Sequence, residues 1–105
     1  MSMSHGELII ELNGALYELR PTLKAMKRIQ TRFNGLRGAM EALSLLNVEH
    51  VAAIIAAGTD AQPKDIAEIE ENVFAHGIGQ ATEQVVPFVT ALINPRAATE
   101  QQTKK

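Results

Sequence analysis

The chain of 105 residues contains no cysteine, and only 4% of its residues are aromatic. Without cysteine there is no disulfide bond, no thiolate catalysis and no cysteine-based metal site. Because aromatic side chains are few, the core must be built mainly from aliphatic side chains. No apolar run approaches the roughly 20 residues that a membrane-spanning helix needs, and the N-terminus lacks the charged start and apolar core of a signal peptide. We therefore expect a cytoplasmic protein without a membrane span.

Neither sign of charge is in large excess, since the formal net charge is −2 at pH 7. Because the net charge is small, the chain as a whole is not drawn to nucleic acid or to an anionic membrane. The charges are nevertheless segregated, since residues 1–46 are net basic and residues 47–94 are net acidic. With 46% hydrophobic and 21% charged residues, the composition is that of a folded protein. The length predicts one compact domain over residues 1–94 and a flexible polar tail over 95–105.

The strongest local pattern is the stretch ELIIELNGALYELR at residues 7–20. Its central Asn-Gly pair favours a two-residue type I′ turn, which needs positive φ at both positions. A hairpin closed by this turn places Glu7 opposite Arg20 at its open end. One of its faces is apolar and should face the core: Leu8, Ile10, Leu12, Ala15, Tyr17 and Leu19. The outer face carries Ile9 and Leu16 among charged residues.

Periodic apolar residues, caps and breaks predict helices in the rest of the chain. Their expected ranges are 22–33, 36–46, 48–57, 64–76 and 80–94. Thr22 and Asn47 are the expected N-caps of the first and third helices, and Asn34-Gly35 should end the first. Pro87 falls on the polar side of the last helix, where it would bend that helix round the core. The sequence thus predicts an α+β fold, mostly α, in which an N-terminal β-hairpin packs against four to five short helices.

Three details of these helices bear on packing. The first helix is amphipathic, and its apolar stripe should lie on the hairpin. The second contains Gly38, which would weaken it by about 1 kcal/mol. The third is apolar nearly all round, so it is either central or covered by another molecule.

Apolar surface in excess of the core often marks a partner site. The third helix and the outer face of the hairpin supply the predicted partner-binding residues: Ile9, Leu16, Val51, Ile54 and Ile55. The bare edges of a two-stranded ribbon also invite strand addition or dimerisation. A homo-oligomer is therefore one expected form of the protein.

The sequence contains no pattern typical of an active site. His5, His50 and His76 are far apart, and none stands in a metal-binding or catalytic spacing. His50 is interpreted as a surface residue, and His76 as a favourable charge at the end of an acidic helix. Glu70 lies between the two sides of that helix, which favours an ion pair with the first helix or a second subunit over catalysis. We predict no catalytic activity, no cofactor and no metal.

A basic strip runs along the first helix, formed by Lys24, Lys27, Arg28 and Arg32. A solvated helix face explains it better than a nucleic-acid site does, because the second helix is not basic and no aromatic residues join the strip. A small nucleic-acid-binding or regulatory module therefore stays a secondary alternative.

The order of these parts resembles a family of phage tail proteins. Residues 6–29, with the Asn-Gly hairpin and the Leu-Arg-Pro-Thr step at 19–22, are similar to small proteins of gene transfer agents and siphophage-like prophages. A looser similarity covers residues 65–92, whereas the sequence departs from the family pattern after Phe33. Family members are described as tail assembly chaperones or tail tube proteins.

The resemblance implies a non-catalytic chaperone in the bacterial cytoplasm, which binds the tail tape measure protein or other tail proteins. A structural component of the tail tube or of its end, retained in the particle, is the alternative that the resemblance leaves open.

Overall fold

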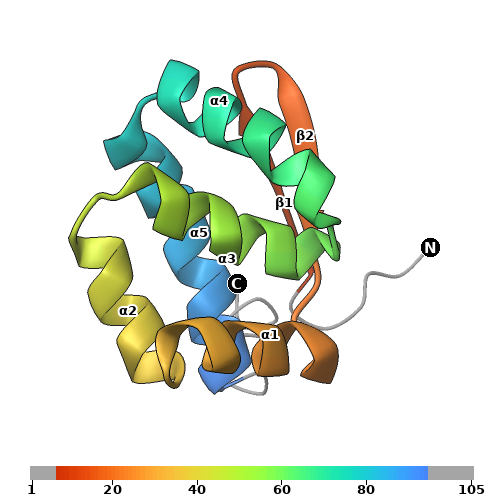
Figure 1. Cartoon of the computed structure of the whole chain (residues 1–105), viewed down its shortest axis with the longest axis vertical. Coiled ribbons are helices and arrows are strands. Elements are labelled where there is room, and N and C mark those ends of the chain that lie inside the picture. Colours follow the sequence, from red (N-terminus) through yellow and green to blue (C-terminus); the bar gives the residue numbers. More distant parts are fainter. Residues whose placement is uncertain (1–6, 95–105) are drawn as a thin grey trace, which may run out of the picture.

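The computed structural model describes residues 7–94 (Figure 1). A β-hairpin is followed by five α-helices and one 3₁₀ turn: β1 (Leu8–Leu12), β2 (Ala15–Leu19), α1 (Leu23–Phe33), α2 (Leu36–Ser44), α3 (Val48–Thr59), η1 (Pro63–Asp65), α4 (Ile66–His76) and α5 (Ile78–Ile93). This is the predicted α+β fold, mostly α. His5 and the predicted tail 95–105 lie outside the described residues. Over 7–94, none of the helices has the length and apolar character that crossing a membrane requires.

The hairpin forms with the predicted register. Asn13 and Gly14 have φ of 54° and 87°, as a type I′ turn requires, and Leu8 pairs with Leu19 at the open end. The backbone N–H of Gly14 donates to the Glu11 carboxylate at 2.7 Å, which steadies the turn. The predicted cross-strand pair of Glu7 and Arg20 is an ion pair of 3.4 Å.

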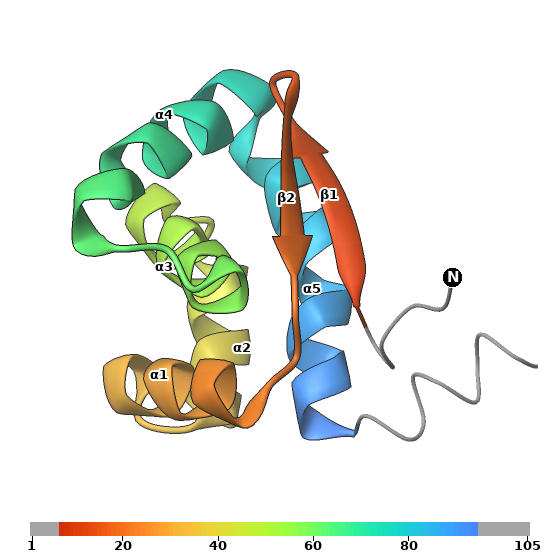
Figure 2. The same ribbon diagram turned by 90° about the vertical axis from the view of Figure 1, so that its right-hand side faces the viewer.

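Helix α3 is the centre of the core. It contacts α1, α2, α4, α5 and strand β2, and Figure 1 shows these elements arranged around it. Figure 2 shows the hairpin along one side of the molecule, with α5 beside β1 and α4 near the turn. The N-cap of α3 is Asn47, as predicted, and its side chain accepts from the His50 N–H. A nearly all-apolar helix is thus accommodated by covering most of its surface within one chain, and Glu49 lies on the exposed remainder.

Helix α1 has the predicted caps but not the predicted neighbour. The Thr22 side chain accepts from the Ala25 N–H, and Asn34 closes the helix in the left-handed region. The helix packs mainly against α2 and α3 rather than on the hairpin. Leu23, expected on the buried stripe, is 66% exposed. The amphipathic pattern identified a buried face of α1, but it carried no information about which element covers that face.

The ends of the other helices differ from prediction by a few residues. Helix α2 ends at Ser44, and Leu46 beyond it turns the chain with a φ of 55° and is half exposed. Helix α5 begins at Ile78, so Gly79 does not break the chain as Gly77 does. Pro87 lies on the exposed side of α5, as predicted. Ile93, expected on the apolar face, is exposed at the end of the helix.

Two helical glycines mark close contacts that the sequence did not reveal. A Cβ at Gly38 would overlap the carbonyl oxygen of Phe33, so glycine is needed where α2 passes the end of α1. Gly58 lies inside α3, not past its end as predicted. A Cβ there would stand 2.9 Å from the ring of Phe88 and 3.0 Å from the side chain of Leu19. These positions let backbones approach, which outweighs the low helix propensity of glycine.

Candidate interaction surfaces

The predicted partner-binding residues separate into two groups. Ile9 is 59% exposed and Leu16 is 71% exposed on the outer face of the hairpin. Val51, Ile54 and Ile55 are fully buried, because they lie on the sides of α3 that neighbouring elements cover. The interpretation of these three residues as a partner surface is therefore wrong. The exposed part of the prediction is the outer hairpin patch, defined as Ile9 and Leu16.

The two side chains of the outer hairpin patch lie on the same face of the ribbon, one on each strand. Ile9 is opposite Glu18 in the register, and Leu16 is two residues before Glu18. Such diagonal neighbours on one face of an antiparallel pair are within reach of long side chains. The two aliphatic side chains thus form one small apolar area on an ordered β-ribbon.

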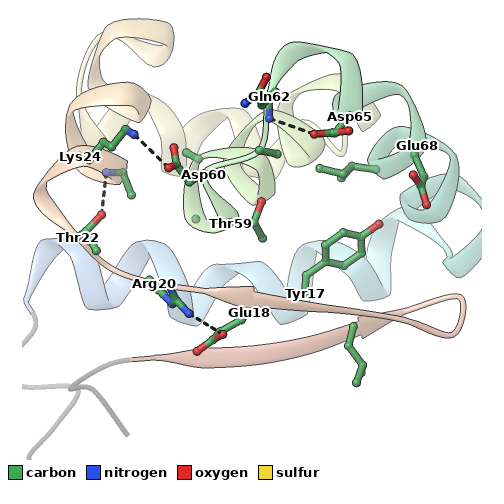
Figure 3. A pocket seen from close by; sticks show the side chains of 16 residues that line it. Tyr17, Glu18, Arg20, Thr22, Lys24, Thr59, Asp60, Gln62, Asp65 and Glu68 are labelled. Atoms are coloured by element: carbon green, nitrogen blue, oxygen red, sulfur yellow. Dashed lines mark hydrogen bonds and ion pairs between the residues drawn. The ribbon is translucent and has the colours of Figure 1, made fainter.

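A cleft of about 730 Å³ lies on the other side of strand β2 (Figure 3). Residues of β2 form one wall, and the α3–α4 connection with the start of α4 forms the opposite wall. Tyr17 points into this space, and its hydroxyl accepts from the side-chain amide of Asn72 at 2.7 Å. Ala57, Gly58 and Ala61 supply small apolar surface between the walls. No sequence pattern indicated this cleft, because its walls come from segments far apart in the chain.

The charged groups of the cleft are unequally paired. Arg20 bonds Glu18 at 3.0 Å, and its guanidinium lowers the pKa of the Glu18 carboxyl by a hydrogen bond and by its charge. Lys24 is paired with Asp60 at 3.0 Å. The Asp65 carboxylate accepts only from the backbone N–H of Gln62. The Glu68 carboxylate has no hydrogen bond or ion pair within residues 7–94. These two carboxylates, Asp65 and Glu68, give the cleft uncompensated negative charge.

The backbone groups at the edge of β2 also face this cleft. A two-residue turn makes its flanking residues, Leu12 and Ala15, a hydrogen-bonded pair. Inward- and outward-pointing backbone groups alternate along an antiparallel strand. The N–H and C=O groups of Leu16 and Glu18 therefore point away from β1, and the part of the chain that the structure describes offers them no hydrogen-bond partner.

Two contacts confirm this alternation and show that other parts of the edges are covered. Next along β2, the outward N–H of Arg20 donates to the Gly58 carbonyl at 3.0 Å. On β1, the side chain of Gln84 bonds both outward groups of Glu11: Oε1 accepts from its N–H at 3.3 Å, and Nε2 donates to its C=O at 3.1 Å. The Gln84 amide thus takes the place of a neighbouring strand. Residues 16–18 of β2, called the β2 edge below, stay open.

The histidines and Glu70 have structural neighbours rather than a shared site. His76 Nδ1 accepts from the backbone N–H of Asn13 at 3.1 Å, so it holds the hairpin turn in addition to ending α4. His50, expected at the surface, is partly buried with its ring edge-on to Phe33. Its Nδ1 is buried and finds no hydrogen-bond partner in the described part of the chain, residues 7–94. The predicted ion pair of Glu70 with the first helix does not form among residues 7–94.

The basic strip is partly neutralised within the chain. Lys24 and Arg28 both lie near Asp60, at 3.0 Å and 3.9 Å. The Arg32 guanidinium stands 5.6 Å from the centre of the Phe33 ring. The strip therefore presents fewer free cations than its sequence indicates.

Comparisons with protein-family models, with curated proteins and with solved structures found no match. They therefore add no support to the resemblance seen in the sequence and do not weaken it. Over residues 7–94, no three His, Asp or Glu side chains are grouped so that they could hold a metal ion.

Proposed function

We propose that the protein is a non-catalytic phage-type tail assembly protein, a chaperone that binds the tail tape measure protein before tube subunits assemble around it. The observation that carries this proposal is the outer hairpin patch, in which Ile9 and Leu16 are 59% and 71% exposed. Large aliphatic side chains on an ordered sheet face are poorly placed for a monomer and well placed for a partner. The resemblance of residues 6–29 supplies the identity of that partner.

The hairpin that carries the patch is held rigidly. Gln84 from α5 forms hydrogen bonds with the β1 edge, and His76 from α4 accepts one from the turn. The Arg20 N–H donates a hydrogen bond to α3. A ribbon fixed in this way loses little freedom on binding, so more of the contact energy is available for affinity. An apolar helix of the tape measure protein laid across the patch would bury both side chains.

Co-expression with the tape measure protein encoded in the same tail gene cluster tests this function. The variants Ile9→Lys and Leu16→Lys should lose co-purification, because each places a charge in the proposed apolar contact. Leu23→Lys is the matched control, because Leu23 is 66% exposed but lies on α1. Unchanged complex formation by both hairpin variants would remove the patch from the interface. A wild-type protein that does not bind the tape measure protein would contradict the function itself.

A structural place in the tail tube or at its end is the alternative. The exposed outer hairpin patch suits a contact between neighbouring tail subunits, whereas one two-stranded hairpin is less strand than a closed β-ring normally needs. The presence of the protein in purified particles would support this alternative over a chaperone that is released.

A further inference from the structure

We infer that the β2 edge is a second binding site, which accepts an extended peptide segment with lysine or arginine side chains as a third strand of the hairpin. The site uses backbone groups, whereas the outer hairpin patch uses side chains on the face of the ribbon. The inference is therefore independent of the proposed function and of the tape measure protein.

The two edges of the hairpin are treated differently, and this difference points to a ligand. The β1 edge is occupied at Glu11 by the Gln84 amide, and the end of β2 is occupied at Arg20 by the Gly58 carbonyl. Among the outward groups that have no hydrogen-bond partner within residues 7–94, those of Leu16 and Glu18 on β2 border the cleft. An added strand satisfies such groups by main-chain hydrogen bonds, which is the mode of peptide recognition by β-augmentation.

The cleft has the size for this occupant. Its volume of about 730 Å³ lies within the range of roughly 300–1,000 Å³ that is typical of binding pockets. Ala57, Gly58 and Ala61 keep the space next to the strand clear of large side chains. Figure 3 shows Tyr17 standing in the cleft beside β2, where it would pack against a bound peptide.

Charge selects a basic peptide. The cations that line the cleft, Arg20 and Lys24, are already paired with Glu18 and Asp60. The remaining lining carboxylates, Asp65 and Glu68, have no cation within residues 7–94. A lysine or arginine of the incoming strand would supply the missing charge.

The same charges argue against a second copy of the chain as the occupant. An antiparallel pairing of two β2 edges would bring the acidic wall of one copy to the acidic wall of the other. Like charges that face one another across paired strands are destabilising. The structure therefore favours a basic segment of another polypeptide over self-association at this edge.

The test measures binding of a fluorescein-labelled peptide of alternating lysine and valine to the full chain by fluorescence anisotropy. An alternating peptide can present either face to the cleft by sliding one residue. Two matched peptides are the controls: one in which glutamate replaces lysine, and one methylated on every backbone nitrogen, which removes the hydrogen-bond donors on both edges. We expect the lysine peptide to bind and both controls to bind at least about tenfold more weakly.

Substitutions in the chain separate the edge from the outer face. Leu16→Pro removes the outward N–H and should weaken binding at least about tenfold, since proline blocks pairing at an edge. Leu16→Thr loses the outer apolar side chain but keeps the N–H, so affinity should stay within about twofold. Ile9→Pro removes an outward N–H on β1 instead of β2, so this variant should retain its affinity for the peptide. Far-UV circular dichroism checks the fold of each variant.

Two charge-changing variants of α4 test the acidic wall of the cleft, formed by Asp65 and Glu68, without altering strand β2. Glu68→Lys should lower the affinity for the lysine peptide by roughly three- to tenfold. Glu71→Lys makes the same change in net charge on the exposed side of α4, outside the cleft, and should have little effect. If Leu16→Pro does not fold, backbone amide shifts of Leu16 and Glu18 in a ¹⁵N-labelled wild-type titration decide the same point. Absence of peptide binding, or equal binding by Leu16→Pro and Leu16→Thr, would overturn the inference.

Discussion

The substitution Gly58→Ala tests whether α3 approaches the hairpin and α5 as closely as the structure requires. The new Cβ would stand 2.9 Å from Cζ of Phe88, and 3.0 Å from Cδ2 and 3.1 Å from Cβ of Leu19. Optimal contacts between carbon atoms are about 3.5–4.0 Å. The ring tip of Phe88 can move a little, but the Leu19 Cβ can move only with β2. Because Arg20 ties β2 to Gly58 by a backbone hydrogen bond, the strain cannot relax locally.

The expected magnitude follows from two opposing effects. Overpacking of a core costs about 1–3 kcal/mol, whereas replacing glycine by alanine inside a helix contributes about 1 kcal/mol. We therefore expect a net loss of up to about 2 kcal/mol in the free energy of unfolding. Gly79→Ala is the control, because within residues 7–94 no atom outside the adjoining turns of α5 lies within 4 Å of the added Cβ. It should stabilise the protein by about 0.4–1 kcal/mol.

Urea denaturation followed by circular dichroism measures both variants against the wild type. The slope with denaturant should stay the same, so that the shift of the midpoint reports stability alone. A loss of about 1 kcal/mol should also lower the melting temperature by about 4–8 °C for a domain of this size. If Gly58→Ala is as stable as Gly79→Ala, the close packing of α3 against the hairpin is wrong.

Three further perturbations have defined outcomes. Gln84→Ala leaves the outward backbone groups of the exposed Glu11 to water, so the free energy of unfolding in urea should fall by about 0.5–1.5 kcal/mol. Gly14→Ala puts a Cβ on a residue with a φ of 87°, and calorimetry should record a loss of about 1–2 kcal/mol. The Arg20 guanidinium lowers the pKa of Glu18 in the fold, so its contribution is present above the unfolded value and disappears as pH falls through the folded value. Stability of the wild type should therefore fall slightly more than that of Glu18→Gln below about pH 4.5, and added salt should reduce the difference because the pair is exposed.

The hairpin was predictable because all of its determinants lie within 14 consecutive residues. The turn sequence, the alternation and the charges at residues 7–20 agree on one register, and the structure has that register. The caps at Thr22, Asn34 and Asn47 were predictable for the same reason. Each acts on backbone groups within a few residues of itself.

The packing partners were not predictable, because they depend on segments far apart in the sequence. An amphipathic pattern identifies which face of α1 is buried. It does not indicate whether the hairpin or helices α2 and α3 cover that face, because this depends on the whole fold. Gly58 shows the same limit: the sequence pattern places it past the end of the helix, whereas the structure uses its missing Cβ where Phe88 and Leu19 approach α3. The contact of Gln84 with Glu11 spans 73 residues, and nothing in either segment indicates it.

The burial of α3 changes where a partner could bind. From the sequence alone, the apolar third helix and the outer face of the hairpin are both expected to contribute to the partner-binding surface. With Val51, Ile54 and Ile55 inside the core, a partner meets the hairpin instead, either on its outer face or along the β2 edge. A face contact depends on the side chains of Ile9 and Leu16, whereas an edge contact depends on the backbone of residues 16–18. Leu16→Thr and Leu16→Pro differ in this respect, so together they identify which surface a given partner uses.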